Sequence, residues 1–170
     1  MEKPILSQLC NSCGLCCDGS LFPTVRLQPG DSSQELKALG FRIQYKKKFQ
    51  FFDQPCVAFK NHCCTIYQER PTRCRLFACT QLKRLSSGET TEEIALKKIQ
   101  EAQSKIAVIK KLFYNLGPTN PKKPLLQQYQ QIISTPVDLA ANKTIVEKRT
   151  QLDEALLNLN AFLNQEFRPA

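Results

Sequence analysis

The sequence has one histidine, no cysteine after Cys79, and no apolar segment long enough to cross a bilayer. Because His62 stands alone, a catalytic pair of histidines and a metal site of two histidines and a carboxylate are both excluded. The apolar runs are far shorter than the roughly 20 residues of a membrane-spanning helix, and Met1-Glu2-Lys3-Pro4 contains no apolar signal segment. We therefore expect a cytoplasmic protein with no membrane partner.

Glycine-rich phosphate loops and dinucleotide-binding fingerprints are also absent, so nothing supports nucleotide-dependent chemistry. The chain has 170 residues, of which 42% are apolar and 23% charged, so it is expected to fold as an ordinary globular protein. Its net charge of +9 leaves nucleic acid as a conceivable partner. The nearest thing to a binding patch is Lys46-Lys47-Lys48 followed by Phe49, Phe51 and Phe52, a pattern that equally describes one strand with a solvated face.

The residue pattern predicts an α-rich fold with minor β structure. Residues 23–28 and 41–52 are rich in β-branched and aromatic residues and are expected to form short strands around a brief helix near Gln34 to Leu39. A helix is expected from about Pro71 to Leu85, ending at Ser86-Ser87-Gly88. These segments, residues 1–88, are expected to form a cysteine-cluster domain with an irregular core.

Residues 89–170 are expected to form a helical extension packed on the first part, with its outer surface open to a protein partner. Apolar residues recur at steps of three and four between Thr91 and Leu116, which predicts one long helix that ends at Gly117-Pro118. A proline-rich connector and a short helix from about Leu125 to Ser134 follow. The last helix presents one apolar face, made of Leu152, Ala155, Leu156, Leu159, Phe162 and Leu163.

Nine cysteines are crowded between Cys10 and Cys79. A cytoplasmic chain meets a reducing thiol pool, and an odd count fits poorly with complete disulfide pairing. Dense cysteines in that setting indicate metal or redox chemistry. The first block, Cys10, Cys13, Cys16 and Cys17, contains two consecutive C-x2-C steps, whose short spacers let the chain wrap one centre with backbone amides turned toward the sulfurs.

Adjacent Cys16 and Cys17 are expected to project in different directions, so either one joins a second centre or only one is a ligand. The second block contains Cys56, Cys63, Cys64, Cys74 and Cys79. On an unbroken helix Cys74 and Cys79 would lie about 140° apart, so either the helix distorts or the two cysteines face different neighbours. His62 stands beside Cys63 and could replace a cysteine ligand.

These blocks resemble the CxxCxxCC (YkgJ-like) cysteine-cluster family of bacterial proteins, described as zinc- or iron-chelating domains. The matching elements cover residues 10–80 and are Cys10-x2-Cys13-x2-Cys16-Cys17, Pro55-Cys56, and Cys64-x-Ile66-Tyr67-x2-Arg70-Pro71-x2-Cys74-Arg75-x-Phe77-x-Cys79. The resemblance implies a small metal-binding domain within a superfamily that also includes flagellin lysine methylases described as carrying an iron–sulfur cluster. The ligands that it implies are Cys10, Cys13, Cys16, Cys17, Cys56, Cys64, Cys74 and Cys79. Cys63 lies outside the family pattern and is interpreted as a spare buried thiol.

Eight thiolates are compatible with two four-thiolate zinc sites, one four-iron cluster with spare cysteines, or a bridged centre. The C-x2-C-x2-C run is typical of a four-iron cluster, and the second block lacks the C-x2-C knuckle usual for structural zinc, so iron is modestly favoured.

Arg70, Arg73 and Arg75 flank Cys74, where positive charge would favour the thiolate over the thiol. Arg70 could instead pair with Asp53 or Glu69 on the surface. Tyr67 and Phe77 are expected to pack over the site.

Three functions stay open at this stage. The first is a metal-binding module for chelation, metal carriage or electron transfer, with an iron–sulfur cluster, such as a four-iron cluster, or zinc as the cofactor. The second is a cluster-dependent modifying enzyme related to the flagellin lysine methylases, which an open coordination position beside a cleft would favour. The third, a zinc-stabilised nucleic-acid-binding protein, ranks last.

Overall fold

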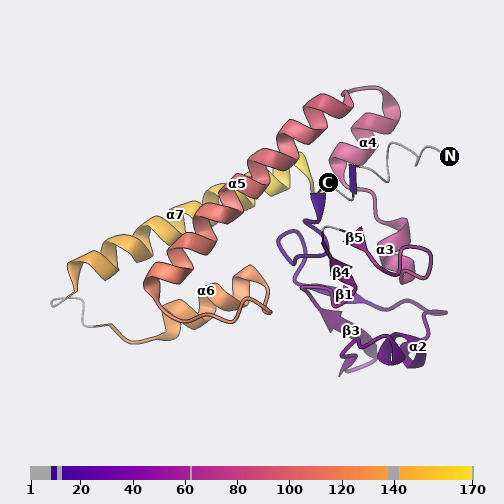
Figure 1. Ribbon diagram of the computed structural model, residues 1–170, viewed down its shortest axis with the longest axis horizontal. Coiled ribbons are helices and arrows are strands. Elements are labelled where there is room, and N and C mark those ends of the chain that lie inside the picture. Colours follow the sequence, from indigo (N-terminus) through magenta and orange to yellow (C-terminus); the bar gives the residue numbers. More distant parts are fainter. Residues whose placement is uncertain (1–8, 11–12, 62, 138–141, 170) are drawn as a thin grey trace.

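The computed structural model describes residues 9–10, 13–61, 63–137 and 142–169. The fold is α-rich with two small sheets, as the sequence predicts. Figure 1 shows a long helical arm on one side and the cysteine-bearing part, with all of the strands, on the other. The helices of the cysteine-bearing part are α2 (Ser33–Ala38), α3 (Thr72–Leu76) and α4 (Thr80–Ser87), and those of the arm are α5 (Glu92–Leu116), α6 (Leu125–Ser134) and α7 (Lys143–Glu166).

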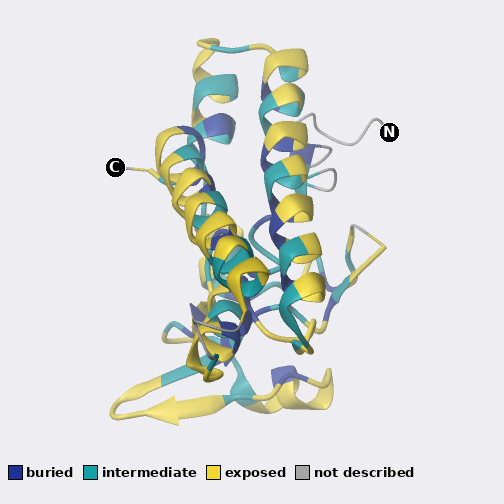
Figure 2. Cartoon of the chain, turned by 90° about the vertical axis from the view of Figure 1, so that its left-hand side faces the viewer, coloured by how far each residue is buried: buried dark blue, intermediate teal, exposed yellow. Residues whose placement is uncertain are grey.

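The larger sheet is antiparallel, with strand order β1-β3-β2. Its strands are β1 (Thr24–Arg26), β2 (Gln44–Lys46) and β3 (Phe49–Asp53). The first two lie inside the segments predicted to be extended, and β3 ends one residue beyond the second segment. Val25 pairs with Phe52, and both side chains are buried, because one face of the sheet packs inward. The outer edge, β2 and the turn after it, is exposed (Figure 2), so the run of three lysines lies on a solvated hairpin.

The smaller sheet is the two-stranded ribbon of β4 (Phe59–Lys60) and β5 (Cys63–Cys64). Its antiparallel register places Phe59 opposite Cys64 and Lys60 opposite Cys63. Because successive side chains alternate between faces in a strand, adjacent Cys63 and Cys64 point to opposite sides of this ribbon.

Two hydrophobic cores hold the chain together. The first core joins the long helices to the first cysteine segment, and consists of Leu9, Leu15, Leu21, Ala95, Ile99, Ala102, Ile106, Ile109, Phe113, Leu125, Ile132, Leu152, Leu159, Leu163 and Phe167. The second core is smaller and lies under the main sheet: Val25, Leu27, Leu36, Phe41, Phe52, Ala58 and Ile66. The metal-ligand candidates lie between these two cores. The division of the chain near residue 88 into two domains stays a prediction.

The prediction of one helix from Pro71 to Leu85 is wrong, because the segment forms two helices, α3 and α4. The break falls at Phe77 and Cys79, whose backbones are extended (ψ 122° and 166°). No glycine or proline marks this break. The angle of about 140° between Cys74 and Cys79 on an ideal helix leaves a distorted helix as one of two alternatives, and the structure shows this distortion. Gly88 ends α4 in the left-handed conformation (φ 76°), at the predicted stop.

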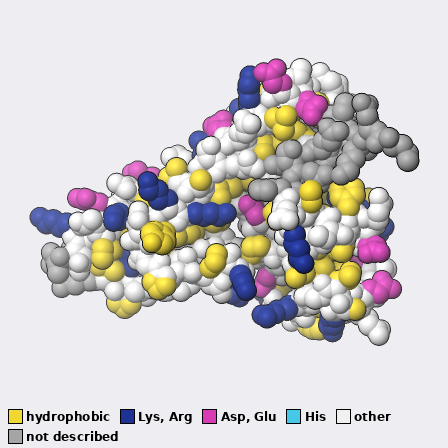
Figure 3. All heavy atoms as spheres, in the orientation of Figure 1, with side chains coloured by type: hydrophobic (Ala, Val, Ile, Leu, Met, Phe, Trp, Pro, Cys, Tyr) yellow, Lys and Arg dark blue, Asp and Glu magenta, His cyan; other side chains and the backbone are white. Residues whose placement is uncertain are grey.

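The long predicted helices are confirmed. Thr91 caps α5, since its side chain accepts a hydrogen bond from the Ile94 amide, and Gly117 follows the last residue of α5. The helices α5 and α7 run antiparallel along the arm (Figure 1). Of the apolar face predicted for α7, Leu152, Leu159 and Leu163 are buried, whereas Ala155, Leu156 and Phe162 are half-buried. In the described part of the chain, no helix is both long enough and apolar enough to span a membrane. Lys and Arg side chains are scattered over the face shown in Figure 3, with acidic groups between them.

A buried carboxylate fastens the end of α7 to α4. Glu166 is 5% exposed, and its Oε2 accepts hydrogen bonds from Gln81 Nε2 at 3.0 Å and Arg84 Nη1 at 3.2 Å. Its Oε1 lies 3.1 Å from Lys98 Nζ of α5. Since α4 starts directly after Cys79, these bonds tie the helical arm to the last of the candidate ligands.

Replacing Glu166 with Gln is expected to cost about 1–3 kcal/mol of unfolding free energy, because Arg84 and Lys98 lose their shared counter-charge. Urea denaturation of the metal-loaded protein measures the change. Glu93→Gln is the matched control, since Glu93 makes only an exposed pair with Lys97 and should cost less than about 1 kcal/mol. Equal costs for the two variants would contradict the structural role of Glu166.

Candidate metal centre

One cavity collects most of the candidate ligands. It has a volume of ≈ 520 Å³ and lies between the first cysteine segment, the β4–β5 ribbon and the helices α3 and α4. Seven of the eight implied ligand cysteines line it: Cys10, Cys13, Cys16, Cys17, Cys64, Cys74 and Cys79. Residues that are far apart in the sequence therefore present their thiols to a common space.

The eighth implied ligand, Cys56, is not part of the cavity wall but lies next to it. Its amide donates a hydrogen bond of 2.7 Å to the carbonyl of Cys17. It precedes β4, whose partner strand carries Cys64. All eight cysteines of the family pattern are thus brought into one region, from segments joined by the short strands and by the break between α3 and α4.

Backbone amides face several of the sulfurs. The Leu15 amide hydrogen-bonds the Cys13 sulfur, those of Ala58 and Phe59 the Cys56 sulfur, and those of Gln81 and Leu82 the Cys79 sulfur. Cys79 is the N-cap residue of α4, the end of a helix where backbone amides have no partner within the helix. Such donors stabilise thiolate over thiol, as at many cysteine-ligated metal centres.

Burial has the opposite effect on the cysteines, because it stabilises the neutral thiol over the thiolate. It raises the pKa of Cys13 and of Cys74 to about 12, and it also raises the pKa of Cys10, Cys16 and Cys17. Neighbouring thiols add to this rise, because two nearby thiolates repel each other. Without a cation the thiols are therefore neutral near pH 7, and the cavity disfavours several adjacent negative charges.

Three arginines supply positive charge at the cavity wall, Arg70, Arg73 and Arg168. Arg70 donates from Nε to the Tyr67 carbonyl at 2.9 Å, and its guanidinium stacks on the Tyr67 ring at 3.7 Å. The alternative role of Arg70, a surface pair with Asp53 or Glu69, is absent from the described ion pairs, and Asp53 accepts a hydrogen bond from Gln44. Arg75 does not line the cavity. The expected packing of Tyr67 and Phe77 over the site agrees with their place in its wall.

Gly14 allows the first cysteine segment to pass closely beneath an aromatic ring. Its φ is +67°, and a Cβ at this position would lie 2.5 Å from Phe59 Cζ. The backbone turns here through two bonds to the Gly14 carbonyl, from the amides of Cys17 and Asp18, each 2.9 Å. Glycine is thus required both by the conformation and by the contact with β4.

Replacing Gly14 with Ala should lower stability by more than the roughly 1–2 kcal/mol that the left-handed conformation alone costs, because the Phe59 ring must also move. Gly88→Ala is the matched control: Gly88 has φ +76° but open space around it. Thermal unfolding of both variants separates the two causes. Equal losses would mean that the Phe59 contact has no energetic importance.

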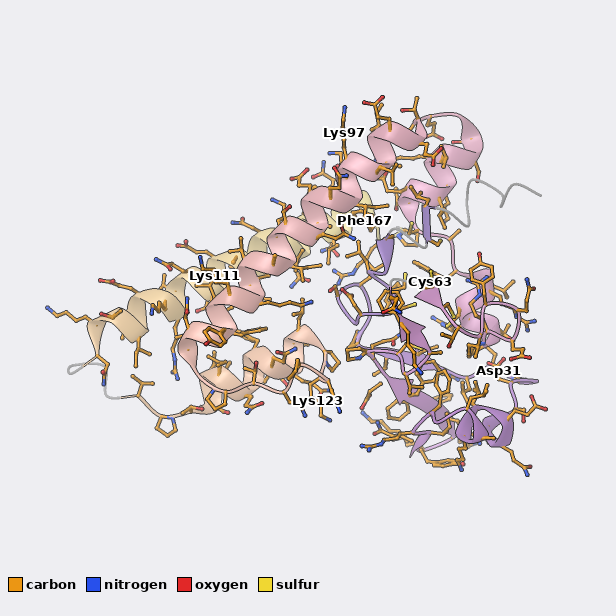
Figure 4. The ribbon with its side chains drawn as sticks, in the orientation of Figure 1. Asp31, Cys63, Lys97, Lys111, Lys123 and Phe167 are labelled. Carbon is orange, nitrogen blue, oxygen red and sulfur yellow. The ribbon has the colours of Figure 1, made fainter. Side chains whose placement is uncertain are left out.

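The prediction that Cys63 is a spare buried thiol is wrong, because the residue is exposed. Strand alternation explains the difference: Cys64 takes the cavity side of β5, which leaves Cys63 on the solvent side. Figure 4 labels Cys63 on the cysteine-bearing part of the molecule. His62, the alternative ligand, lies outside the described residues.

The structure also places residues at the candidate site that no sequence motif predicted. Gln103 of α5 donates to the Cys13 carbonyl at 3.2 Å, and Arg168 donates to the Leu21 carbonyl at 3.1 Å and lines the cavity. Gln54 is 3% exposed in the cavity wall, and its Oε1 has no hydrogen-bond partner in the part of the chain that the structure describes. A donor bound in the cavity would satisfy this oxygen.

The donor set is suited to a thiophilic metal, since soft thiolates select zinc, iron–sulfur clusters and copper(I). Among the described residues, no three His, Cys, Asp or Glu side chains converge closely enough to hold one ion. The thiols are thus gathered around a cavity and do not meet at one point.

Comparison with known proteins gives one match. The model of the CxxCxxCC family, described as "Putative zinc- or iron-chelating domain", matches residues 9–97. No curated protein and no solved structure matches the chain. The matched range contains all nine cysteines, α4 and the first turn of α5, and excludes most of the helical arm.

Proposed function

Starting from the fact that the chain belongs to the CxxCxxCC family of zinc- or iron-chelating domains, we propose that it carries an iron–sulfur cluster or zinc on its clustered cysteines. The observation that carries the proposal is the cavity that seven cysteines, from residues 10 to 79, line together. Chance burial does not explain such a set, because uncharged thiols gain nothing from facing one another. A metal would neutralise them as thiolates.

The proposed ligands are Cys10, Cys13, Cys16, Cys17, Cys56, Cys64, Cys74 and Cys79. Cys63 is left out because it is exposed. The amides that face the sulfurs of Cys13, Cys56 and Cys79 would take part of the negative charge of the bound thiolates. These donors and the nearby arginines suit a centre of high negative charge.

Iron is favoured over zinc within this proposal. The C-x2-C-x2-C run from Cys10 to Cys16 has the spacing of a run that holds a four-iron cluster. Zinc needs only four thiolates for a closed structural site, and its usual knuckles are separated C-x2-C pairs. The role of the protein would be metal chelation, metal carriage or electron transfer in the cytoplasm.

Metal and acid-labile sulfide analysis, with an ultraviolet–visible spectrum, tests the proposal on protein purified without oxygen. A brown protein with similar amounts of iron and sulfide is the expected result. Colourless protein with zinc and no sulfide would overturn the iron assignment and leave chelation by zinc. Protein that takes up neither metal under reducing conditions would overturn the proposed function.

A second candidate is a cluster-dependent modifying enzyme, favoured by the space beside the thiols, which Arg70, Arg73 and Arg168 line with positive charge. Catalysis at a metal needs a coordination position that a substrate can reach. Adding cyanide or imidazole to the metal-loaded protein and recording its spectrum tests this point. A saturable spectral change favours the enzyme, whereas an unchanged spectrum favours a fully thiolate-bound centre.

A further inference from the structure

One set of thiols surrounds Cys16. Burial is the main cause of its raised pKa, and the thiols of Cys13, Cys17, Cys79 and Cys10 contribute next. After burial, Cys79 also raises the pKa of Cys10 and of Cys13. The contacts give the grouping: Cys13, Cys16 and Cys79 pack against the first core, and Cys10 directly follows Leu9, a buried member of that core. The Gly14 amide also donates a hydrogen bond of 3.3 Å to the Cys10 carbonyl. We name Cys10, Cys13, Cys16 and Cys79 the first thiol group; Cys17, the chain neighbour of Cys16, is placed by its bond with Cys56.

Cys17 has a different set of neighbours. After burial, its raised pKa comes from the thiols of Cys56, Cys64 and Cys74. Cys56 and Cys64 likewise contribute to the raised pKa of Cys74, after burial. The bond of 2.7 Å from the Cys56 amide to the Cys17 carbonyl fixes these two segments side by side. We name Cys17, Cys56, Cys64 and Cys74 the second thiol group.

Packing separates the same two groups without reference to charge. Three members of the first thiol group, Cys13, Cys16 and Cys79, pack against the first core. Three members of the second thiol group, Cys56, Cys64 and Cys74, pack against the second core. The break between α3 and α4 separates Cys74, in the second thiol group, from Cys79, in the first thiol group.

Arg70 lies within electrostatic reach of both groups. Burial raises the pKa of Cys10 in the first group and of Cys74 in the second, and the Arg70 charge opposes both rises. Its stacking on Tyr67 and its bond to the Tyr67 carbonyl hold the guanidinium in place. One fixed cation thus serves two neighbouring sets of thiols, and would reduce the repulsion between two anionic centres.

We propose that the eight cysteines form two separate four-thiolate metal centres, one for each thiol group, with the division falling between Cys16 and Cys17. Four thiolates complete the tetrahedral shell of a zinc ion and also suffice for one iron–sulfur cluster. Since no three of the described thiols lie close enough to hold one ion, each group would have to close around its metal on binding. The inference rests on the proposed function, because a protein that binds no metal has neither centre. It excludes a single cluster with four spare cysteines.

Cysteine-to-serine variants purified without oxygen test the division, with iron, zinc and sulfide measured per chain. The single variants are Cys13→Ser and Cys74→Ser. The double variants are Cys13→Ser with Cys79→Ser, within one group, and Cys13→Ser with Cys74→Ser, across the groups. Cys63→Ser is the matched control, since that thiol is exposed and belongs to neither group.

Each single variant is expected to lose the metal of one centre and keep that of the other. The double variant within a group should lose no more than its parent single variant, whereas the double variant across the groups should lose all of the metal. Equal losses in the two double variants would overturn the division while leaving metal binding intact. Wild-type protein without metal would overturn the proposed function itself.

Native mass spectrometry of the wild-type protein gives a second measurement that needs no variant to fold. The expected mass is that of the chain plus two centres, whether two zinc ions, two clusters or one of each. A mass that corresponds to a single zinc ion or a single cluster, in protein supplied with excess metal and sulfide, would overturn the proposal.

Discussion

Removing the metal is expected to lower the stability of the cysteine-bearing part far more than that of the helical arm. The second core contains only seven residues, and its strands are two to five residues long, so this part has little apolar burial of its own. Thiolate binding of a structural zinc contributes about 10–16 kcal/mol in small domains, as much as the whole stability of an ordinary one. The arm keeps the buried faces of α5 and α7.

Hydrogen exchange before and after treatment with a strong chelator, under reducing conditions, measures this effect. Amides of β1, β2 and β3 should lose a large part of their protection after chelation, and the middle of α5 should keep most of its own. A chelator already saturated with metal is the control for its direct effects on the protein. Unchanged protection of the strands, once elemental analysis shows that the metal is gone, would mean that the fold does not depend on it.

The helices could be predicted because each has a local signal. The apolar spacing of α5, its Thr91 cap and the Gly117 stop lie within a single continuous segment. The break at Phe77 to Cys79 has no such signal, because ordinary residues adopt an extended conformation there for tertiary reasons. The break allows Cys74 and Cys79 to lie against different parts of the fold.

The candidate site could be predicted as a set of residues but not as an arrangement. Spacing singled out the cysteines, and the identity of adjacent Cys16 and Cys17 suggested that they diverge. Which thiols are neighbours depends on strand pairing and core packing between distant segments, and a single sequence does not contain that information. The same limit applies to Gln103 and Arg168, which reach the site from the helical arm without any motif.

Stability should respond to pH with opposite signs in the metal-free and the metal-loaded protein. In the metal-free protein burial raises the pKa of Cys13 and Cys74 from the ordinary value of 9.0 to about 12. The folded state then holds its thiol protons more tightly than the unfolded chain. The stability that depends on these neutral thiols is complete below about pH 9 and is lost as pH rises from about 9 to about 12, by up to roughly 4 kcal/mol for each thiol.

In the metal-loaded protein the thiols are bound as thiolates, and unfolding in the presence of a chelator returns one proton to each of them below about pH 9. Because the unfolded chain then binds more protons, stability rises with pH up to about 9 and levels off above it. Denaturant titrations of both forms between pH 6 and pH 11, without oxygen, should give curves that diverge as the pH rises. Metal uptake at pH 7 should also release about four protons per four-thiolate centre, which a weakly buffered indicator solution measures. Parallel curves and no proton release would show that the cysteines do not bind the metal as thiolates.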